Sequence, residues 1–131
     1  VTACQEELAK EIFSPTGKVW FLPEELMGAV IGVSGSGPAY VYLFIEALIE
    51  GGVAAGLSHD VARELAIQTV LGAGQMVLET GEHPAKLKNM VSSPAGTTIA
   101  ALRVLEAGGL RSAIMDAVLA ASEGPKGFGG K

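Results

Sequence analysis

An apolar run between Pro38 and Ala55 constrains this chain of 131 residues more than any other feature. Aliphatic and aromatic side chains fill almost every position from Tyr40 to Ile49, and only Glu46 and Glu50 mark a polar face. A helix that is apolar nearly all round has to be buried on most sides. A chain this short has little of its own surface to cover such a helix, so we expect a second subunit to cover it.

A membrane span is the alternative for this region, because no charged side chain occurs between Leu26 and Ile45. That length is about the 20 residues that a spanning helix requires. Two features disfavour it. The segment Ser34-Gly35-Ser36-Gly37-Pro38 interrupts the middle of the stretch, and the residues that flank it are acidic rather than basic. A buried core or interface helix is therefore the preferred interpretation, with no membrane as partner.

The Ser34–Gly37 segment itself is interpreted as a hinge between two helices, the first of which runs from Pro23 to about Gly32. It does not fit a nucleophile elbow, because the closing glycine is missing and no strand precedes it. It does not fit a dinucleotide fingerprint either, because the third glycine is missing and the segment lies between helices.

Capping signals divide the rest of the chain into further helices. Thr2 and Ser58 are side chains that can cap the first amides of a helix, Pro84 suits the first turn of one, and glycine ends the helices at Gly81 and at Gly108-Gly109. The predicted helices run from Thr2 to about Ser14, from Ser58 to about Thr80, from Ala85 to about Met90, from Thr97 or Thr98 to Gly108-Gly109, and from Leu110 to about Ser122.

One short strand is predicted, over Lys18–Leu22, where the residues are Lys-Val-Trp-Phe-Leu. A lone strand leaves its backbone ladder unpaired. We therefore expect residues 1–23 to be the tail of an α/β domain whose sheet lies upstream. Residues 24–122 then form a helical domain, and the glycine-rich residues 123–131 form a disordered tail.

Composition excludes several classes of function. The net charge of −5 argues against a nucleic-acid partner, because that contact needs clustered Lys and Arg. Cys4 is the only cysteine, so no internal disulfide can form. His59 and His83 have neither a cysteine nor the spacing that a metal site requires, so we expect no metal. No secretory signal is visible at the N-terminus, and we expect a cytoplasmic protein.

The best candidate site on physical grounds is the segment Ser93-Pro94-Ala95-Gly96-Thr97-Thr98. Proline and glycine shape a turn, hydroxyl groups flank it, and a helix starts immediately after. Free N–H groups at a helix start, together with the helix dipole, favour a carboxylate or a phosphate. The alternative is that these residues only cap the helix.

The ordered series of motifs resembles the pyrroline-5-carboxylate reductases over essentially all of residues 1–122. The segments that carry the resemblance are Leu26-Met27, Val33 to Val41, Glu46-Ala47-Leu48, Gly51-Gly52-Val53, Gly56-Leu57, Gln68 to Ala73, Glu82-His83-Pro84, Leu87-Lys88, Val91 to Ile99, Leu105-Glu106 and Gly108 to Arg111. The Ser-Pro-x-Gly-x-Thr segment is the most specific of them.

The resemblance implies a mainly α fold: an interlocking helical dimerisation domain like the C-terminal domain of 6-phosphogluconate dehydrogenase, preceded by a helix–strand remnant of a Rossmann domain. It implies a homodimer, assembled in some members into a larger ring. The full enzyme reduces 1-pyrroline-5-carboxylate to L-proline, transferring hydride from NADPH or NADH. Because the chain contains no dinucleotide fingerprint, we expect a fragment of that oxidoreductase that binds no cofactor alone and is inactive alone.

The resemblance also implies site residues. The substrate carboxylate would be bound by the hydroxyl of Ser93 and the amides of Thr97 and Thr98, in the loop that contains Gly96. The hydroxyl of Thr98 would lie near the ring nitrogen as the catalytic group, Val91 would shape the loop, and Glu82 corresponds to an acidic residue near the bound ring.

Two departures from the family stand out: Ala95 replaces a usual glycine, which requires a negative φ there, and residues 123–131 do not resemble the usual charged helix. The alternative function is a non-catalytic helical scaffold.

Overall fold

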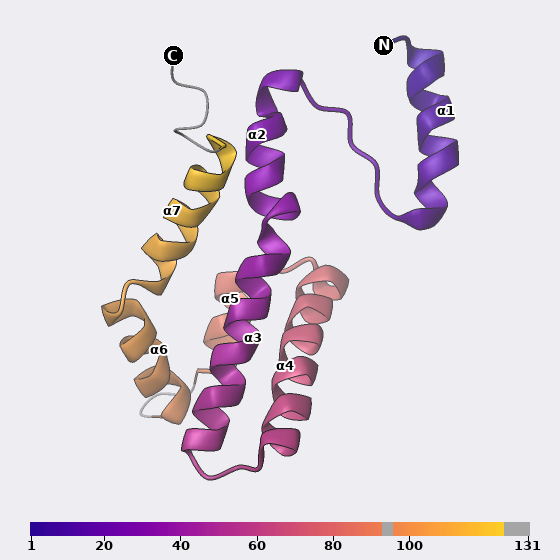
Figure 1. Ribbon diagram of the computed structural model, residues 1–131. Coiled ribbons are helices and arrows are strands. Elements are labelled where there is room, and N and C mark those ends of the chain that lie inside the picture. The colour runs from indigo at the N-terminus through magenta and orange to yellow at the C-terminus, as the bar shows by residue number, and fades with distance from the viewer. Residues whose placement is uncertain (93–95, 125–131) are drawn as a thin grey trace, which may run out of the picture.

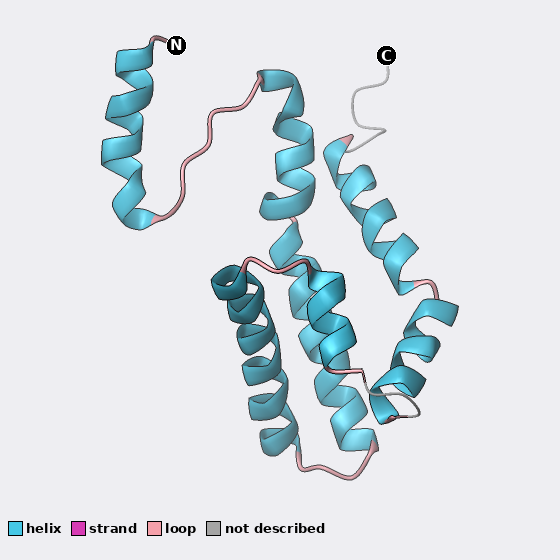
Figure 2. Ribbon diagram, turned by 180° about the vertical axis from the view of Figure 1, so that it is seen from behind, coloured by secondary structure: helices cyan, strands magenta, loops and turns pink. Residues whose placement is uncertain are grey.

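The computed structural model describes residues 1–92 and 96–124, and in these residues every regular element is helical (Figure 2). The mainly α prediction is therefore confirmed. The helices are α1 (Ala3–Phe13), α2 (Met27–Val30), α3 (Gly37–Ala54), α4 (His59–Thr80), α5 (Pro84–Met90), α6 (Thr97–Ala107) and α7 (Leu110–Ser122). Single 3-10 turns cover Ser14–Thr16 and Glu24–Leu26, and a π-helical turn covers Ile31–Gly35.

The element that organises the fold is a long central rod made of α2, the π turn and α3 (Figure 1). The predicted hinge lies at the π turn, where the amide of Ser36 donates to the carbonyl of Ile31 at 2.8 Å. Pro38 has no N–H to continue the regular ladder, and a π turn is one way for a helix to absorb such an interruption. The hinge is thus a change of helical pitch and not a break between separate helices.

Capping residues set the helix boundaries close to where the sequence predicts them. Thr2 forms a capping box with Gln5 at the start of α1. The hydroxyl of Ser58 accepts from the amide of Val61 at 3.3 Å and opens α4. Gly81 ends α4 in the left-handed conformation, with φ of 64°. Such a φ is accessible to glycine at little steric cost.

Two contacts hold the helices against the rod, and both use small residues. On one side α4 packs antiparallel to α3, where Ala62 and Ala66 are 3% and 5% exposed and are the buried apolar side chains of the described chain. On the other side α7 packs against α2 and the π turn, at the level of Gly28 and Gly32. α6 connects to α7 through Gly109, whose φ is 77°.

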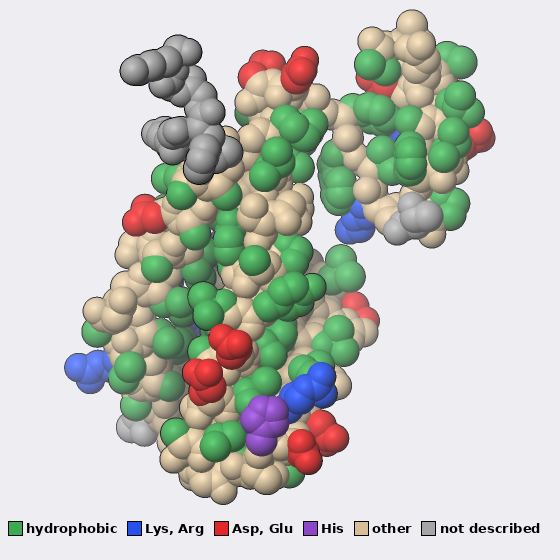
Figure 3. Space-filling view, viewed as in Figure 1, with side chains coloured by type: hydrophobic (Ala, Val, Ile, Leu, Met, Phe, Trp, Pro, Cys, Tyr) green, Lys and Arg blue, Asp and Glu red, His purple; other side chains and the backbone are tan. Residues whose placement is uncertain are grey.

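The described chain buries very little of its apolar surface. Its accessible area is 10516 Å², whereas a compact monomer of this mass exposes about 6,500 Å². Large side chains such as Trp20, Tyr42 and Leu43 are about two-thirds exposed, at 70%, 69% and 66%. Apolar side chains therefore cover much of the face seen in Figure 3. This excess of about 4,000 Å² is surface that a second subunit, or other parts of a larger protein, would have to cover.

The prediction of a strand over Lys18–Leu22 is wrong for the described chain, since these residues form an extended connection without a paired neighbour. A strand needs a second backbone to complete its ladder, and none lies beside this segment within the described residues. Helix α1 stands apart from the other helices at the end of this connection (Figure 1). Lys10 lies over the ring of Phe21, with 5.5 Å between Nζ and the ring centroid, and joins α1 to the connection.

The helical stretch Glu24–Ala54 is long and apolar enough to cross a membrane, judged by length and composition alone. Only 11% of its most apolar window is buried within the chain. The core helix of a soluble oligomer meets the same criteria. The prediction of a disordered tail falls mostly on residues 125–131, which lie outside the described residues.

Candidate carboxylate site at the start of α6

Helix α6 begins without a side-chain cap. Gly96 occupies the N-cap position with φ of −82° and ψ of 167°, and its carbonyl accepts from the amide of Ala100 at 3.4 Å. The three preceding amides, of Thr97, Thr98 and Ile99, point out of the helix start. Within residues 1–92 and 96–124 no acceptor satisfies them.

This geometry suits a small anion. Free amides that converge at a helix start bind a carboxylate or phosphate through directional hydrogen bonds, and the helix dipole adds a favourable field. Thr98 and Gly96 are half-buried, whereas Thr97 is exposed. The start of α6 is therefore partly shielded from water, and its first N–H groups have no acceptor among the residues that the structure describes.

The other side of the loop is the end of α5. Val91 follows that helix and is 69% exposed. Ser92 forms two hydrogen bonds to α5. Its hydroxyl donates to the carbonyl of Lys88 at 2.6 Å, and its amide donates to the carbonyl of Asn89 at 3.1 Å. Ser92 is thus occupied internally. The predicted donor Ser93 lies outside the described residues, together with Pro94 and Ala95, and so does the expected negative φ of Ala95.

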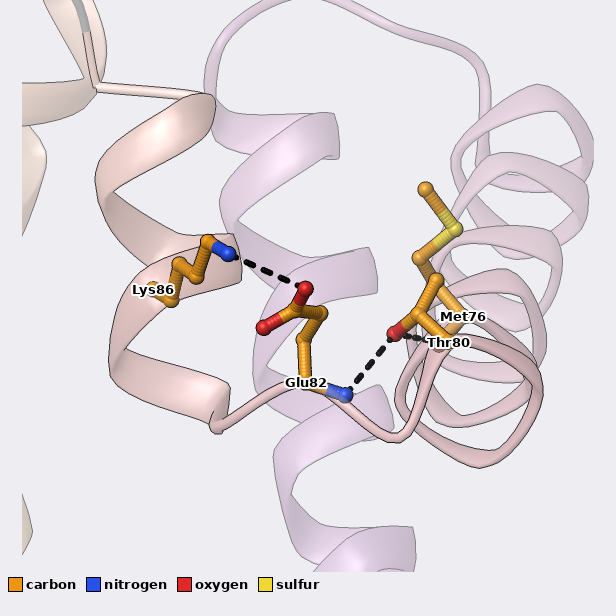
Figure 4. Close-up of polar contacts among 4 residues, drawn as sticks. All are labelled: Met76, Thr80, Glu82 and Lys86. Atoms are coloured by element: carbon orange, nitrogen blue, oxygen red, sulfur yellow. Dashed lines mark hydrogen bonds and ion pairs between the residues drawn. The ribbon is translucent and has the colours of Figure 1, made fainter.

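Glu82 lies just before the first residue of α5, whereas the loop follows the last residue of that helix. Its carboxylate forms an ion pair with Lys86 at 3.0 Å, and both side chains are well exposed. Its amide donates to Oγ1 of Thr80, whose hydroxyl in turn donates to the carbonyl of Met76 (Figure 4). The seven-residue helix α5 separates Glu82 from Val91 by about 10 Å. The described chain thus brings Val91, Gly96, Thr97 and Thr98 to one loop and leaves Glu82 apart.

His83 has a structural role. Its Nδ1 accepts from the amide of Ala85 at 3.1 Å and caps α5. Glu82 pairs with Lys86 and not with His83, and the pair is a solvated surface contact. Among the described residues no group of His, Cys, Asp and Glu could hold a metal ion.

The clearest electrostatic effect lies at the other end of α6. Arg111 donates through Nη2 to Oε1 of Glu106 at 2.9 Å. This hydrogen bond, with the charge of Arg111, lowers the pKa of Glu106 below its usual value, and the pKa of Arg111 is raised in return. Both side chains are exposed. The pair joins α6 to α7 and takes no part in the loop that precedes α6.

Tyr40 is a residue that the sequence analysis did not single out. Its hydroxyl lies 2.9 Å from the carbonyl of Gly32 in the π turn and 3.4 Å from that of Ala117 in α7. Tyr40 therefore links α3, the π turn and α7. The sequence signal that could have found it is Pro38 two residues earlier, because the missing N–H leaves carbonyl groups of the preceding turn in need of another donor.

Residues 24–126 match the family model described as pyrroline-5-carboxylate reductase dimerisation. The pyrroline-5-carboxylate reductase of Synechocystis sp. is 61% identical over 113 residues, which are 86% of this chain and 42% of that protein. Among solved structures, a pyrroline-5-carboxylate reductase from Coxiella burnetii superposes with a TM-score of 0.88 at 41% identity, over 94% of this chain and 46% of that one. The Plasmodium falciparum pyrroline carboxylate reductase, solved with NADP bound, gives a TM-score of 0.85 at 37% identity, over 94% and 47%. The chain thus spans less than half the length of these relatives.

Proposed function

This chain belongs to the pyrroline-5-carboxylate reductase family through its dimerisation domain, and on that premise we propose that it is the part of such an enzyme that pairs two subunits and binds the substrate carboxylate. The reaction would be the reduction of 1-pyrroline-5-carboxylate to L-proline in the cytoplasm. The uncapped start of α6 is the observation that carries this proposal.

The substrate binds through its carboxylate in this proposal. The amides of Thr97 and Thr98 donate to the two carboxylate oxygens, with Ser93 as a further donor from the loop. The hydroxyl of Thr98 faces the ring nitrogen and orients the imine or its proton. Val91 borders the loop and shapes it. Glu82 approaches the ring from the other end of α5 only if a second subunit or a closing motion brings it there.

The cofactor would be NADPH or NADH, which supplies the hydride. Nothing in the described residues fits a dinucleotide: Ser34-Gly35-Ser36-Gly37 lies within a π turn and α3, and no strand–turn–helix unit precedes it. Cofactor binding would therefore reside in a Rossmann domain of the whole protein, to which residues 1–23 would belong. The described residues position the substrate and hold its charge.

The exposed apolar surface supports a homodimer. The chain exposes about 4,000 Å² more than a compact monomer would, which is more than enough surface for one side of a large obligate interface. A ring of dimers, as the family resemblance implies, would bury more of it.

A binding experiment tests the carboxylate site. L-Proline is titrated into the isotopically labelled chain, and the amide shifts of residues 96–99 are followed, with pyrrolidine as the control ligand that lacks a carboxylate. We expect shifts at Thr97 and Thr98 with proline and none with pyrrolidine. A non-catalytic scaffold predicts no shifts at saturating proline.

A pair of variants sharpens this test. Gly96→Asp places a carboxylate at the N-cap, where it accepts from the same amides and repels an incoming carboxylate. Gly96→Asn supplies a similar cap without the charge. We expect Gly96→Asp to weaken proline binding about tenfold to a hundredfold, as for losing hydrogen bonds to a charged group, and Gly96→Asn to weaken it less. Equal binding by both variants would place the carboxylate elsewhere.

A further inference from the structure

The last turn of α5 ends in an arrangement that uses the hydroxyl group of Ser92. In a continuing α-helix the amide of Ser92 would donate to the carbonyl of Lys88, four residues earlier. Here that amide donates to the carbonyl of Asn89 instead, at 3.1 Å. This change tightens the last turn and leaves the Lys88 carbonyl without its usual donor. The Ser92 hydroxyl takes the place of that donor, because Oγ donates to the Lys88 carbonyl at 2.6 Å.

The bond between Ser92 and Lys88 is a strong one by its geometry. A distance of 2.6 Å lies at the short end of the range for hydrogen bonds between a hydroxyl and an oxygen. Both residues are half-buried, so water replaces a lost donor less readily here than on an open surface. Ser92 therefore holds the end of α5 through its backbone and its side chain together.

The position of Ser92 in the chain connects this bond to the proposed carboxylate site. Val91 and Ser93, which are predicted to shape that site and to bind in it, are the direct neighbours of Ser92 in the sequence. Gly96, the N-cap of α6, follows only four residues after Ser92. A connection of that length spans at most about 14 Å. A change in the direction in which the chain leaves α5 is therefore passed on to the start of α6 or absorbed within a few residues.

Lys88 relates the end of α5 to α6 in a second way. The hydrogen bond and the charge of Arg111 are the main causes of the lowered pKa of Glu106, and the charge of Lys88 lowers that pKa further. The Lys88 ammonium group therefore lies within electrostatic range of the last turn of α6. Lys88 thus interacts with Ser92 through its carbonyl and with α6 through its charge.

We infer that Ser92 is a positioning residue for the carboxylate site. Its hydroxyl fixes the exit of the chain from α5 and so sets where the amides of Thr97 and Thr98 lie relative to the donor Ser93. The inference rests on the proposed function and divides the work between two adjacent serines. The hydroxyl of Ser92 bonds to the protein, and the hydroxyl of Ser93 bonds to the substrate carboxylate.

Proline binding by variants of Ser92 tests this role. L-Proline is titrated into the isotopically labelled chains, and the amide shifts of residues 96–99 give the dissociation constant. Ser92→Ala removes the hydroxyl and lets the amide return to the Lys88 carbonyl. We expect proline binding to weaken about threefold to tenfold, as for the loss of one neutral hydrogen bond. Ser92→Thr keeps a hydroxyl that can bond four residues back, and it should restore binding to within about twofold of the unaltered chain.

Ser122→Ala is the matched control. The hydroxyl of Ser122 donates to the carbonyl of Leu119 at 2.7 Å at the end of α7, so this variant loses the same kind of bond away from the loop. We expect its proline affinity to equal that of the unaltered chain. Equal losses in Ser92→Ala and Ser122→Ala would indicate a general loss of stability, and no loss in Ser92→Ala would show that the loop does not depend on this hydroxyl. Either result overturns the inference.

A spectroscopic measurement follows the bond itself. The NMR resonance of the Lys88 carbonyl carbon should move in Ser92→Ala and keep its position in Ser92→Thr. An unmoved resonance in Ser92→Ala would show that the bond does not form in solution and would overturn the inference. If Ser92→Ala does not fold, Ser92→Cys takes its place, because a thiol is of similar size and a weak donor; we expect a loss of proline binding in the same direction, and undiminished binding would overturn the inference.

The unaltered chain separates the two levels of inference. If its amides at residues 96–99 do not shift at saturating proline, the proposed function fails and the role of Ser92 fails with it. If the unaltered chain binds proline and Ser92→Ala binds it equally well, the carboxylate site stands and only the positioning role of Ser92 is overturned.

Discussion

The two contacts that hold helices against the central rod differ in what touches what. Where α3 meets α4, side chains meet: a Cβ added at Gly52 would lie 3.1 Å from the Cβ of Ala62. Where the π turn and α2 meet α7, the glycines of these segments lie directly against the backbone of α7. A Cβ added at Gly32 would lie 2.5 Å from the carbonyl oxygen of Val118, and one added at Gly28 would collide with the carbonyl oxygen of Ser122.

The difference separates a tolerant contact from an intolerant one. Methyl groups can shift by a few tenths of an ångström, whereas a helix carbonyl is fixed by its own hydrogen bonds. We infer that the α2–α7 contact depends on glycine at two positions one turn apart, and that the α3–α4 contact depends only on small volume. Substitutions on each side test this distinction.

The largest effect is expected from Gly32→Ala. The clash with the Val118 carbonyl should cost about 1–3 kcal/mol, which outweighs the roughly 1 kcal/mol that alanine gains over glycine in a helix. The measurement is the urea midpoint at one fixed protein concentration, because oligomers unfold in a concentration-dependent way. Gly51→Ala is the control, since nothing lies within 4 Å of a Cβ there. A Gly32→Ala midpoint at or above that of the unaltered chain would show that α7 can move away freely.

A smaller loss is expected from Tyr40→Phe, which removes the hydroxyl that joins the π turn to α7. The carbonyl of Gly32 then loses a donor at a half-buried position, and the cost should be about 0.5–1.5 kcal/mol. Amide hydrogen exchange should become faster at Ser36, whose N–H forms the π-type bond to Ile31. Tyr42→Phe serves as the control in the same helix. If the exchange rate at Ser36 did not change, the Tyr40 hydroxyl would not be what stabilises the π turn.

A still smaller change is expected from Gly52→Ala on the tolerant side. The added methyl group meets the Ala62 Cβ at 3.1 Å and Cδ1 of Leu57 at 3.5 Å. The modest crowding and the gain of about 1 kcal/mol in helix propensity should largely cancel. Adding Ala62→Gly relieves the crowding, so a double-mutant cycle of urea midpoints should give a favourable coupling. A loss as large as that of Gly32→Ala would remove the distinction between the two contacts.

The smallest effect is expected at the corner between α6 and α7, in Arg111→Gln. Glu106 has a pKa below its unfolded value because of Arg111, so the pair stabilises the fold above the unfolded pKa. That stabilisation is lost as the pH falls through the folded pKa. NMR titration should show the pKa of Glu106 rising in the variant, and melting temperatures should differ slightly at neutral pH and converge in acid. Arg103→Gln is the control. If the pKa of Glu106 were the same in the variant as in the unaltered chain, the ion pair would not be populated in solution.

Most helix boundaries could be predicted because their causes are local. Ser58 caps α4, Gly81 ends it and Pro84 opens α5, each through its own backbone and the residues next to it. The start of α6 at Thr97 likewise depends on the residues next to it. The strand over Lys18–Leu22 failed because a strand depends on a second backbone, which no local pattern in this segment supplies. The role of Ser93 and the torsion of Ala95 remain predictions.

The candidate site was only partly predictable for the same reason. Gly96 has no side chain to cap the helix, which is visible in the sequence, and the amides of Thr97 and Thr98 accordingly have no acceptor among the described residues. The separation of Glu82 from that loop is not visible there, because it depends on the length and direction of α5. Likewise, Tyr40 could be seen as an apolar helix residue, but its bond to Gly32 depends on the π turn.

By itself, the sequence determined the helical composition, the capping points and the apolar character of α3, because each depends on residues within about one turn of the chain. It also determined the family, because the family's motifs follow one another in order along the chain. Tertiary structure alone decided which faces meet: the backbone contact at Gly28 and Gly32, the pairing of α3 with α4, and the groove between these two helices. Such contacts join residues far apart along the chain, and their geometry arises only when the helices pack.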